Sequence, residues 1–338
     1  MSTSNDHTPP RRRWLPLIIL LGLVVLIFAG SSVYVGQVSH TFTSNLRRGA
    51  AMPTGAEPAT DPQTDSDRGG SAGPTVTGRP LNVVLIGSDS RDPENAGSGR
   101  SDTLMLVHLN AARDKAYLIS FPRDMWVDIP GHGQAKINAA YAWGGTALTV
   151  QTLQDLVGVR MDHLAVMDFE GLIQLTEQLG GVTIMNDHAF TRHGFSYPEG
   201  EITLSGEQAL WFVRERYLLP RGDFDRAENQ RKVVKAIIAK GLSPQTLANP
   251  AKFSAFVGSL AQNMTVDDGL TDSVIRSLVL SSRLTPSGVI SMQAPVSGTG
   301  TSADGQSIDV VDQAKLAELA KALQDDTVDR YHAKYPDD

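Results

Sequence analysis

The sequence predicts an α/β fold, an α-β-α sandwich in which a mixed sheet is covered by helices on both faces, preceded by one transmembrane helix. Short apolar, β-branched runs alternate along the chain with segments of helical period, an order that packs helices against a sheet. A long uncharged apolar run lies near the N-terminus, and a segment rich in Ser, Thr, Gly and Pro separates it from the first strand. We therefore expect a membrane anchor, a spacer and one folded domain.

The N-terminal segment predicts how the chain is anchored. Three arginines, Arg11 to Arg13, precede an uncharged run over residues 14–36. About 20 helical residues cross the hydrocarbon core of a bilayer, so this run is long enough. Basic residues favour the cytoplasmic side, which predicts a cytoplasmic N-terminus over 1–13 and an extracellular domain in a single-pass cell-membrane protein. The alternative is a cleaved signal peptide, whose apolar region is usually only about 7–15 residues long.

The rest of the chain divides into a spacer, a domain and a tail. Residues 37–79 have few periodic apolar positions, so they predict a flexible extracellular linker. Residues 80–325 carry all the strand and helix patterns and predict one folded domain. Residues 326–338 are mostly polar and predict a C-terminal tail.

Within the domain, strands and helices are expected in a definite order. Apolar β-branched runs predict strands, and a polar turn between two of them predicts a hairpin. Apolar positions three and four residues apart predict helices, and Ser205 with Gln208 has the pattern of a capping box. The expected strands are 81–87, 103–109, 116–121, 163–167, 182–185 and 288–293. The expected helices are 146–157, 169–179, 205–211, 226–240, 249–260, 271–280 and 310–323.

Composition excludes several classes of site. There is no cysteine, so neither disulfides nor thiolate metal sites can form. The eight histidines lack the spacing of the common zinc motifs. A net charge of −7 argues against a general nucleic-acid binder.

Charged residues follow or precede three of the expected strands. Asp89 comes directly after the first strand, Arg100 and Asp102 come just before the second, and Arg123 follows the third. Ligand sites in α/β folds lie beyond the carboxyl ends of strands, so these residues could share one rim of the sheet. Asp89 and Asp102 together could supply carboxylate oxygens to Mg²⁺. Taken singly, each cluster also fits a turn cap or a surface ion pair.

A second concentration of charge lies in the stretch WFVRERYLLPRGDFDRAENQ. Arg214 and Arg216 are two residues apart and would project to one side of an extended segment. Arg226 and Gln230 are four apart and would share one face of a helix, whose N-terminus Asp223 could cap. Clustered guanidinium groups beside a helix N-terminus indicate an anion site, most simply for phosphate.

Several motifs in order give the chain a family resemblance. They are NVVLIGSDSR, RSDTLMLVHLN, LISFPRDMWVDIP, KINAAYAWGG, FEGLIQLTEQLGGV, LSGEQALWFVRERY and GDFDRAENQ. On these motifs the chain resembles the LytR-CpsA-Psr family of membrane-anchored cell-wall enzymes. The resemblance implies a phosphotransferase that moves a glycopolymer from a polyprenyl-pyrophosphate carrier to a muramic-acid hydroxyl of peptidoglycan, forming a phosphodiester.

The resemblance also implies roles for individual residues. Asp89 and Asp102 would hold Mg²⁺, or Mn²⁺ in its place, and Asp223 would orient arginines or accept the proton of the attacking hydroxyl. The residues expected to bind the pyrophosphate are Arg100, Arg123, Lys136, Arg214, Arg216, Arg226 and Gln230; those expected to take part in catalysis are Asp89, Arg100, Asp102, Arg123 and Asp223.

Two other functions fit the same residues, and two positions depart from the family motif. The same site could hydrolyse a polyprenyl pyrophosphate, or the chain could be an envelope regulator that binds polyprenyl phosphate without catalysis. The family places an apolar slot for the lipid inside the domain, with Leu172, Leu175, Leu210 and Phe212 as candidates for its lining. An apolar helix stripe of this kind is more often ordinary core. Asp225 stands where the motif often has Gly, and Asn229 where it often has Arg, which removes one cation.

Overall fold

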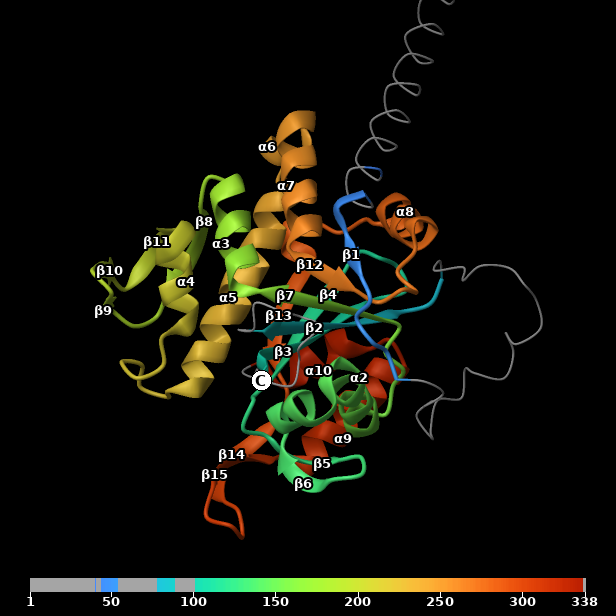
Figure 1. The fold of residues 1–338 in the computed structure, drawn as a ribbon, viewed down its shortest axis with the longest axis vertical. Coiled ribbons are helices and arrows are strands. Elements are labelled where there is room, and N and C mark those ends of the chain that lie inside the picture. Colours follow the sequence, from blue (N-terminus) through green and yellow to red (C-terminus); the bar gives the residue numbers. More distant parts are fainter. Residues whose placement is uncertain (1–39, 41–43, 54–77, 89–100, 337–338) are drawn as a thin grey trace, which may run out of the picture.

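The computed structural model describes residues 40, 44–53, 78–88 and 101–336, and its centre is a seven-stranded mixed sheet (Figure 1). In spatial order the strands are β1 (Arg47–Arg48), β12 (Met264–Val266), β7 (His163–Asp168), β2 (Leu81–Ser88), β3 (Ser101–Leu109), β4 (Ala116–Phe121) and β13 (Val289–Gln293). β2, β3 and β4 form an antiparallel meander, while β2–β7 and β4–β13 are parallel pairs. The predicted mixed sheet and its central hairpin are therefore confirmed.

Helices cover both faces of the sheet, because successive residues of the central strand point to opposite sides. Val84 and Ile86 of β2 pack with residues of α2 (Asn138–Val157), α9 (Gln313–Gln324) and α10 (Val328–Lys334). The alternating position Val83 packs instead with Val274 of α8 (Asp272–Ser281). The predicted helices on both faces are thus confirmed.

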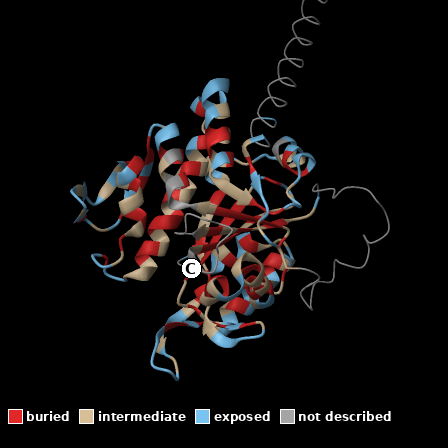
Figure 2. Cartoon of the chain, viewed as in Figure 1, coloured by how far each residue is buried: buried red, intermediate tan, exposed pale blue. Residues whose placement is uncertain are grey.

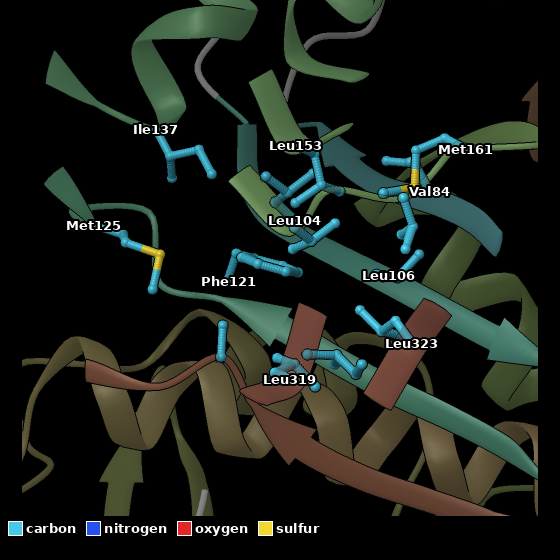
Figure 3. Close-up of a cluster of buried hydrophobic side chains, with 14 of the residues drawn as sticks. Val84, Leu104, Leu106, Phe121, Met125, Ile137, Leu153, Met161, Leu319 and Leu323 are labelled. Carbon is cyan, nitrogen blue, oxygen red and sulfur yellow. The ribbon is translucent and has the colours of Figure 1, made fainter. Parts of the chain in front are cut away.

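The larger core lies between the sheet and the α2–α9 layer. Figure 3 shows Leu104 and Leu106 of β3 facing Leu153 of α2 and Leu319 of α9. All four side chains are buried, and Figure 2 shows the buried residues following the sheet and the inner faces of the helices. At about 25 cal/mol per Å² of apolar area, burial of this kind is the main stabilising contribution to the fold.

A second core lies among four other helices. It joins α3 (Phe169–Gln178), α4 (Gly206–Arg214), α5 (Asp223–Gly241) and α7 (Pro250–Gln262) with the antiparallel pair β8 (Val182–Asn186) and β11 (Gly200–Leu204). Leu175 and Phe212, which were considered as lining for a lipid slot, are completely or almost completely buried in this core. Leu210 packs against it, and the side chain of Leu172 lies outside the described part.

Three further hairpins extend from these layers. They are β5 (Trp126–Ile129) with β6 (Gly133–Lys136), β9 (Phe190–Arg192) with β10 (Phe195–Tyr197), and β14 (Val296–Thr301) with β15 (Ser307–Val311). A parallel bridge between Met125 and Asp309 joins β15 to the start of β5. The β5–β6 and β14–β15 hairpins therefore lie together at one end of the domain, as Figure 1 shows.

The structure differs from the predicted boundaries at both ends of the domain. Part of the predicted linker 37–79 belongs to the fold, because β1 pairs with β12 and Leu46 is buried. Part of the predicted tail 326–338 forms α10, with Val328 and Tyr331 in the main core. Both segments are too short to show a period by themselves, and tertiary packing decides their structure.

The last predicted helix begins later than expected. Residues 307–311 form β15, so helix α9 starts at Gln313 with Asp312 as its N-cap. The predicted transmembrane segment 14–36 lies outside the described residues. Among the residues that are described, no helix has both the length and the apolar character to cross a bilayer.

Candidate active site

Three strand ends meet at one edge of the sheet. β2 ends at Ser88, whose register partner is Ser101, the first residue of β3, and Phe121 at the end of β4 pairs with Leu104 of β3. Residues that leave these strands therefore start from neighbouring positions. Asp89 and Arg100 lie outside the described residues, and Asp102 lies in β3 but its side chain is not described. The structure describes the strand residues that border this gap, Ser88 and Ser101.

Asp223 is the centre of a group of arginines from three parts of the chain. Its Oδ1 atom lies 2.7 Å from Nη2 of Arg226, 3.3 Å from Nε of Arg123 and 3.7 Å from Nη1 of Arg216. Arg123 follows β4, Arg216 lies in the loop after α4, and Arg226 is in the first turn of α5. We call these four residues the Asp223 cluster. The fold thus brings together four of the predicted site residues.

The Asp223 cluster has the electrostatics of an anion site. Three guanidinium groups share one carboxylate, and Arg226 is only 6% exposed. The cluster also lies at the N-terminus of the 19-residue helix α5, where the backbone carries partial positive charge. Asp223 is the first residue of the helix rather than its predicted cap, because Gly222 occupies the N-cap with a φ of 57°. The carboxylate is engaged by arginines instead.

Lys136 joins the same group through Asp124. The Nζ atom of Lys136 on β6 lies 2.8 Å from Oδ1 of Asp124, and Oδ2 of Asp124 lies 3.7 Å from Nε of Arg123. Asp124 follows Arg123 in the motif FPRD, but sequence reasoning gave it no role. The structure shows that it links Lys136 to the Asp223 cluster.

Gln230 connects three elements around the site. Its Oε1 atom accepts a hydrogen bond of 2.8 Å from the hydroxyl of Thr103 on β3, and its Nε2 atom donates one of 3.3 Å to the carbonyl of Val213 on α4. As predicted, Gln230 and Arg226 share the buried side of α5. Thr103 is adjacent to Asp102, so Gln230 fixes α5 against the strand that carries this predicted metal ligand.

Glu215 organises the loop between the predicted arginines. It is only 2% exposed, and its Oε1 atom accepts hydrogen bonds of 2.7–3.0 Å from the backbone N–H groups of residues 216–218. Its Oε2 atom lies 3.2 Å from Nε of Arg192. Because Glu215 is buried, residues 214–216 are not a ladder of ion pairs on the surface. The extended segment expected for Arg214 is wrong, since Arg214 ends helix α4 and lies over the ring of Trp211 at 5.9 Å.

Arg221, which had no predicted role, is held by two carboxylates of α5. Its Nε atom lies 2.7 Å from Oδ1 of Asp225, and Nη2 lies 2.6 Å from Oε2 of Glu228. Asp225 is buried, and it also accepts the backbone N–H of Arg221 at 2.8 Å. The Asp at position 225, where the family motif often has Gly, therefore anchors the loop that leads into α5.

Arg231 is a buried cation that sequence reasoning missed. It donates to the hydroxyl of Ser120 at the end of β4 and, at 3.4 Å, to Oε1 of Gln293 at the end of β13. Burial lowers the pKa of its guanidinium to about 10. Arg231 thus fastens α5 to the ends of two strands, one turn beyond the Asp223 cluster.

Asp309 is a further carboxylate beside these residues, and sequence reasoning missed it too. It lies on β15 and is 6% exposed, and its backbone N–H donates to the carbonyl of Asp124 at 2.9 Å. Burial, and then the negative charges of Asp124 and Asp223, raise the pKa of its carboxyl to about 6, against the opposing effect of Lys136 and Arg123. The segment SIDVV offered no signal, because β15 itself was not predicted.

The raised pKa of Asp309 predicts a change in stability with pH. The folded protein keeps this proton up to about pH 6, whereas an unfolded chain loses it near the ordinary value of 3.8, so stability falls as pH rises through that window. Asp309→Asn should therefore raise the free energy of unfolding at pH 7 by about 1–2 kcal/mol. This is less than the full free energy that corresponds to the pKa shift, because solvent screens part of the charge. Below about pH 3.8 the gain should vanish. Urea unfolding at both pH values measures it, and a variant no more stable than wild type at pH 7 would contradict it.

No group of three or more His, Asp or Glu side chains within the described part of the chain is arranged to hold a metal ion. The two predicted Mg²⁺ ligands are not among these side chains, because Asp89 and the side chain of Asp102 lie outside the described part. The Mg²⁺ site therefore stays a prediction.

The chain is similar to proteins of one known family. A model of the LytR_cpsA_psr family matches residues 51–325. A protein of Enterococcus faecalis named polyisoprenyl-teichoic acid–peptidoglycan teichoic acid transferase TagU is 34% identical over 246 residues, which are 72% of this chain and 79% of the relative.

Two solved structures share the fold. Bacillus subtilis TagU gives a TM-score of 0.52 at 29% identity, over 73% of this chain and 96% of that chain. TagT bound to LIIa-WTA gives a TM-score of 0.60 at 26% identity, over 82% of this chain and 99% of that chain. With a family model that spans most of the chain and a relative above 30% identity, the chain belongs to the LytR_cpsA_psr family.

Proposed function

We propose that this protein transfers a glycopolymer from a polyprenyl-pyrophosphate carrier to a hydroxyl of peptidoglycan. The observation that carries the proposal is the Asp223 cluster, in which three arginines from distant parts of the chain meet at a helix N-terminus beside the strand ends. A pyrophosphate is an anion that this arrangement fits in both charge and geometry. The names of the relatives, which are transferases of polyisoprenyl-linked teichoic acid to peptidoglycan, support the same reaction.

The residues would act mainly by position and charge. Phosphoryl transfer needs little covalent chemistry from the protein, and its transition state is stabilised by fixed positive groups. Arg123, Arg216 and Arg226 would face the pyrophosphate oxygens, with Asp223 keeping their guanidinium groups in register. Arg214, at the end of α4, would add a further positive charge near the pyrophosphate. Glu215 and Gln230 would hold the loop and the helix that carry these cations.

A divalent cation fits the expected donor set. Ser88 and Ser101 are register partners, so the strand that leads to Asp89 and the strand that contains Asp102 are neighbours. Carboxylates are the hard oxygen ligands that Mg²⁺ takes, with waters and phosphate oxygens completing its shell. When bound there, the ion would neutralise negative charge on the pyrophosphate.

The proposed reaction is a displacement at phosphorus. A muramic-acid hydroxyl oxygen forms a bond to the sugar-attached phosphorus, and the bond from that phosphorus to the bridging oxygen breaks. Polyprenyl phosphate leaves with the electron pair, and the hydroxyl proton passes to a base. The arginines neutralise the charge that develops on the leaving phosphate.

The reaction would take place outside the cell. We propose that residues 14–36 anchor the chain with the N-terminus in the cytoplasm, since arginines precede this apolar run. The folded domain would then meet its lipid-linked donor at the outer face of the membrane.

Removing Arg123 or Asp102 should abolish transfer without unfolding the domain. Arg123→Ala removes one of three guanidinium groups around Asp223, and Asp102→Ala removes a predicted metal ligand, so each should lower the transfer rate at least about 100-fold. Melting temperature reports on the fold, and attachment of labelled glycopolymer to wall fragments reports on activity. A doubly substituted protein that still attached glycopolymer would refute the proposed site.

A further inference from the structure

The carboxylates around the site are not equivalent. Asp223 contacts three arginines, at 2.7 Å for Arg226, and Asp124 receives Lys136 at 2.8 Å. Side-chain cations therefore contact both of these carboxylates. Asp223 was one expectation for the base, but its three guanidinium contacts suit it to orienting arginines.

Asp309 has the opposite surroundings. Its carboxylate forms no hydrogen bond or ion pair with any residue that the structure describes, although it lies among charged side chains. Its place is fixed through the backbone, by the 2.9 Å hydrogen bond to the Asp124 carbonyl and the bridge to Met125. It therefore combines a fixed position with a carboxylate that is free to accept a proton.

Asp309 reaches the site from a different part of the fold than Arg216 and Arg226. β15 and β5 lie together at one end of the domain, whereas α4 and α5 lie side by side in another part of it (Figure 1). Arg123 connects the two parts, since it contacts both Asp124 and Asp223. A pyrophosphate held by the arginines would leave the Asp309 side for the attacking group.

The charged groups that face Asp309 make it a suitable base near neutral pH. The acids Asp124 and Asp223 oppose its ionisation, together with burial, and Lys136 and Arg123 favour it. The balance raises the pKa of its carboxyl to about 6. Such a group is ionised at pH 7 and binds a proton more strongly than an ordinary carboxylate, which is what general-base catalysis requires.

We propose that Asp309 is the general base that takes the proton from the attacking peptidoglycan hydroxyl. This inference rests on the proposed function. As the hydroxyl oxygen bonds to the sugar-attached phosphorus, its proton moves to the Asp309 carboxylate, and polyprenyl phosphate departs with the electrons of the broken bond. The protonated Asp309 then releases the proton to solvent. No further reactant is needed.

The test is the pH dependence of transfer by the full chain. With saturating lipid-linked donor, the wild-type rate should fall on the acid side with a midpoint near pH 6. Asp309→Asn should lower the rate at pH 7 by about 10²–10⁴-fold and remove that acid limb. Its dissociation constant for polyprenyl pyrophosphate should stay within about threefold of wild type, because the arginines are intact. Asp304→Asn, on the exposed turn before β15, is the matched control and should behave as wild type.

A second variant tests the role of Asp309 without substituting Asp309 itself. Asp124→Asn removes a negative charge that faces Asp309 and releases Lys136, so the acid limb should move to lower pH. The inference is overturned if Asp309→Asn keeps its acid limb or most of its rate, or if the limb of Asp124→Asn does not move. Should Asp309→Asn fail to fold, the limb of Asp124→Asn decides the matter. A wild-type protein that transfers nothing at any pH refutes the proposed function instead.

Discussion

Arg226→Ala should lower glycopolymer transfer at least about 100-fold while the domain stays folded. Arg226 makes the shortest contact in the Asp223 cluster, 2.7 Å, and is nearly buried at the N-terminus of α5. Removing one preorganised donor from a developing negative charge typically costs about 2.7–4 kcal/mol of transition-state stabilisation. The fold should survive, because Asp223 keeps Arg123 and Arg216 as partners.

Two companion variants separate charge from position. Arg226→Lys keeps the charge but loses the planar fork of donors, so it should recover only part of the rate. Arg221→Ala removes an arginine from the same stretch, but one bound to Asp225 and Glu228 rather than to Asp223. Its transfer rate, measured with labelled donor, should stay close to that of wild type. Equal losses in Arg226→Ala and Arg221→Ala would show that the Asp223 cluster has no special role.

Glu215→Ala should destabilise the domain by about 1–3 kcal/mol and lower transfer with it. The substitution leaves the backbone N–H groups of residues 216–218 without their acceptor and Arg192 without its carboxylate. Leaving hydrogen-bonding groups without their acceptor carries a penalty of this size, whereas the side chain of Arg192 is 41% exposed and can be solvated by water. Because the same loop carries Arg216, the site should also lose part of its geometry.

The matched control for Glu215 is Glu207 on α4. Glu207 is exposed and accepts a hydrogen bond from the indole of Trp211, so Glu207→Ala should change the free energy of unfolding by less than about 1 kcal/mol. Glu215→Gln keeps an oxygen acceptor for the backbone and should cost less than the alanine. Urea unfolding measures all three. If Glu215→Ala were as stable as Glu207→Ala, the buried carboxylate would not be what holds this loop.

The sequence predicted the central strands and most of the helices because their patterns are local. Runs such as LNVVLIG have the apolar character of a buried strand, and α5 has an apolar face that includes Val233 and Ile237. β1 and α10 could not be predicted, because Leu46 and Tyr331 gain their apolar contacts only when distant segments pack on them.

The candidate site was predicted in part for a similar reason. Arg123, Asp223 and Arg226 stand in motifs with a recognisable order, and the fold brings them together. Asp309 and Glu215 depend on burial and on contacts with residues far along the chain, which a linear pattern does not encode. Asp309 in particular is brought to the site by the bridge between β15 and Met125 and by its backbone hydrogen bond to Asp124.

The most direct test of the proposed function follows the phosphorus itself. A donor carrying ³²P in the phosphate attached to the sugar would be incubated with the full chain, Mg²⁺ and peptidoglycan. We expect the label to become covalently bound to peptidoglycan at a rate that depends on Arg226. Label released as soluble glycopolymer phosphate would indicate a hydrolase, and label that stays on the lipid would indicate a binding protein. Either result would contradict the proposed transfer.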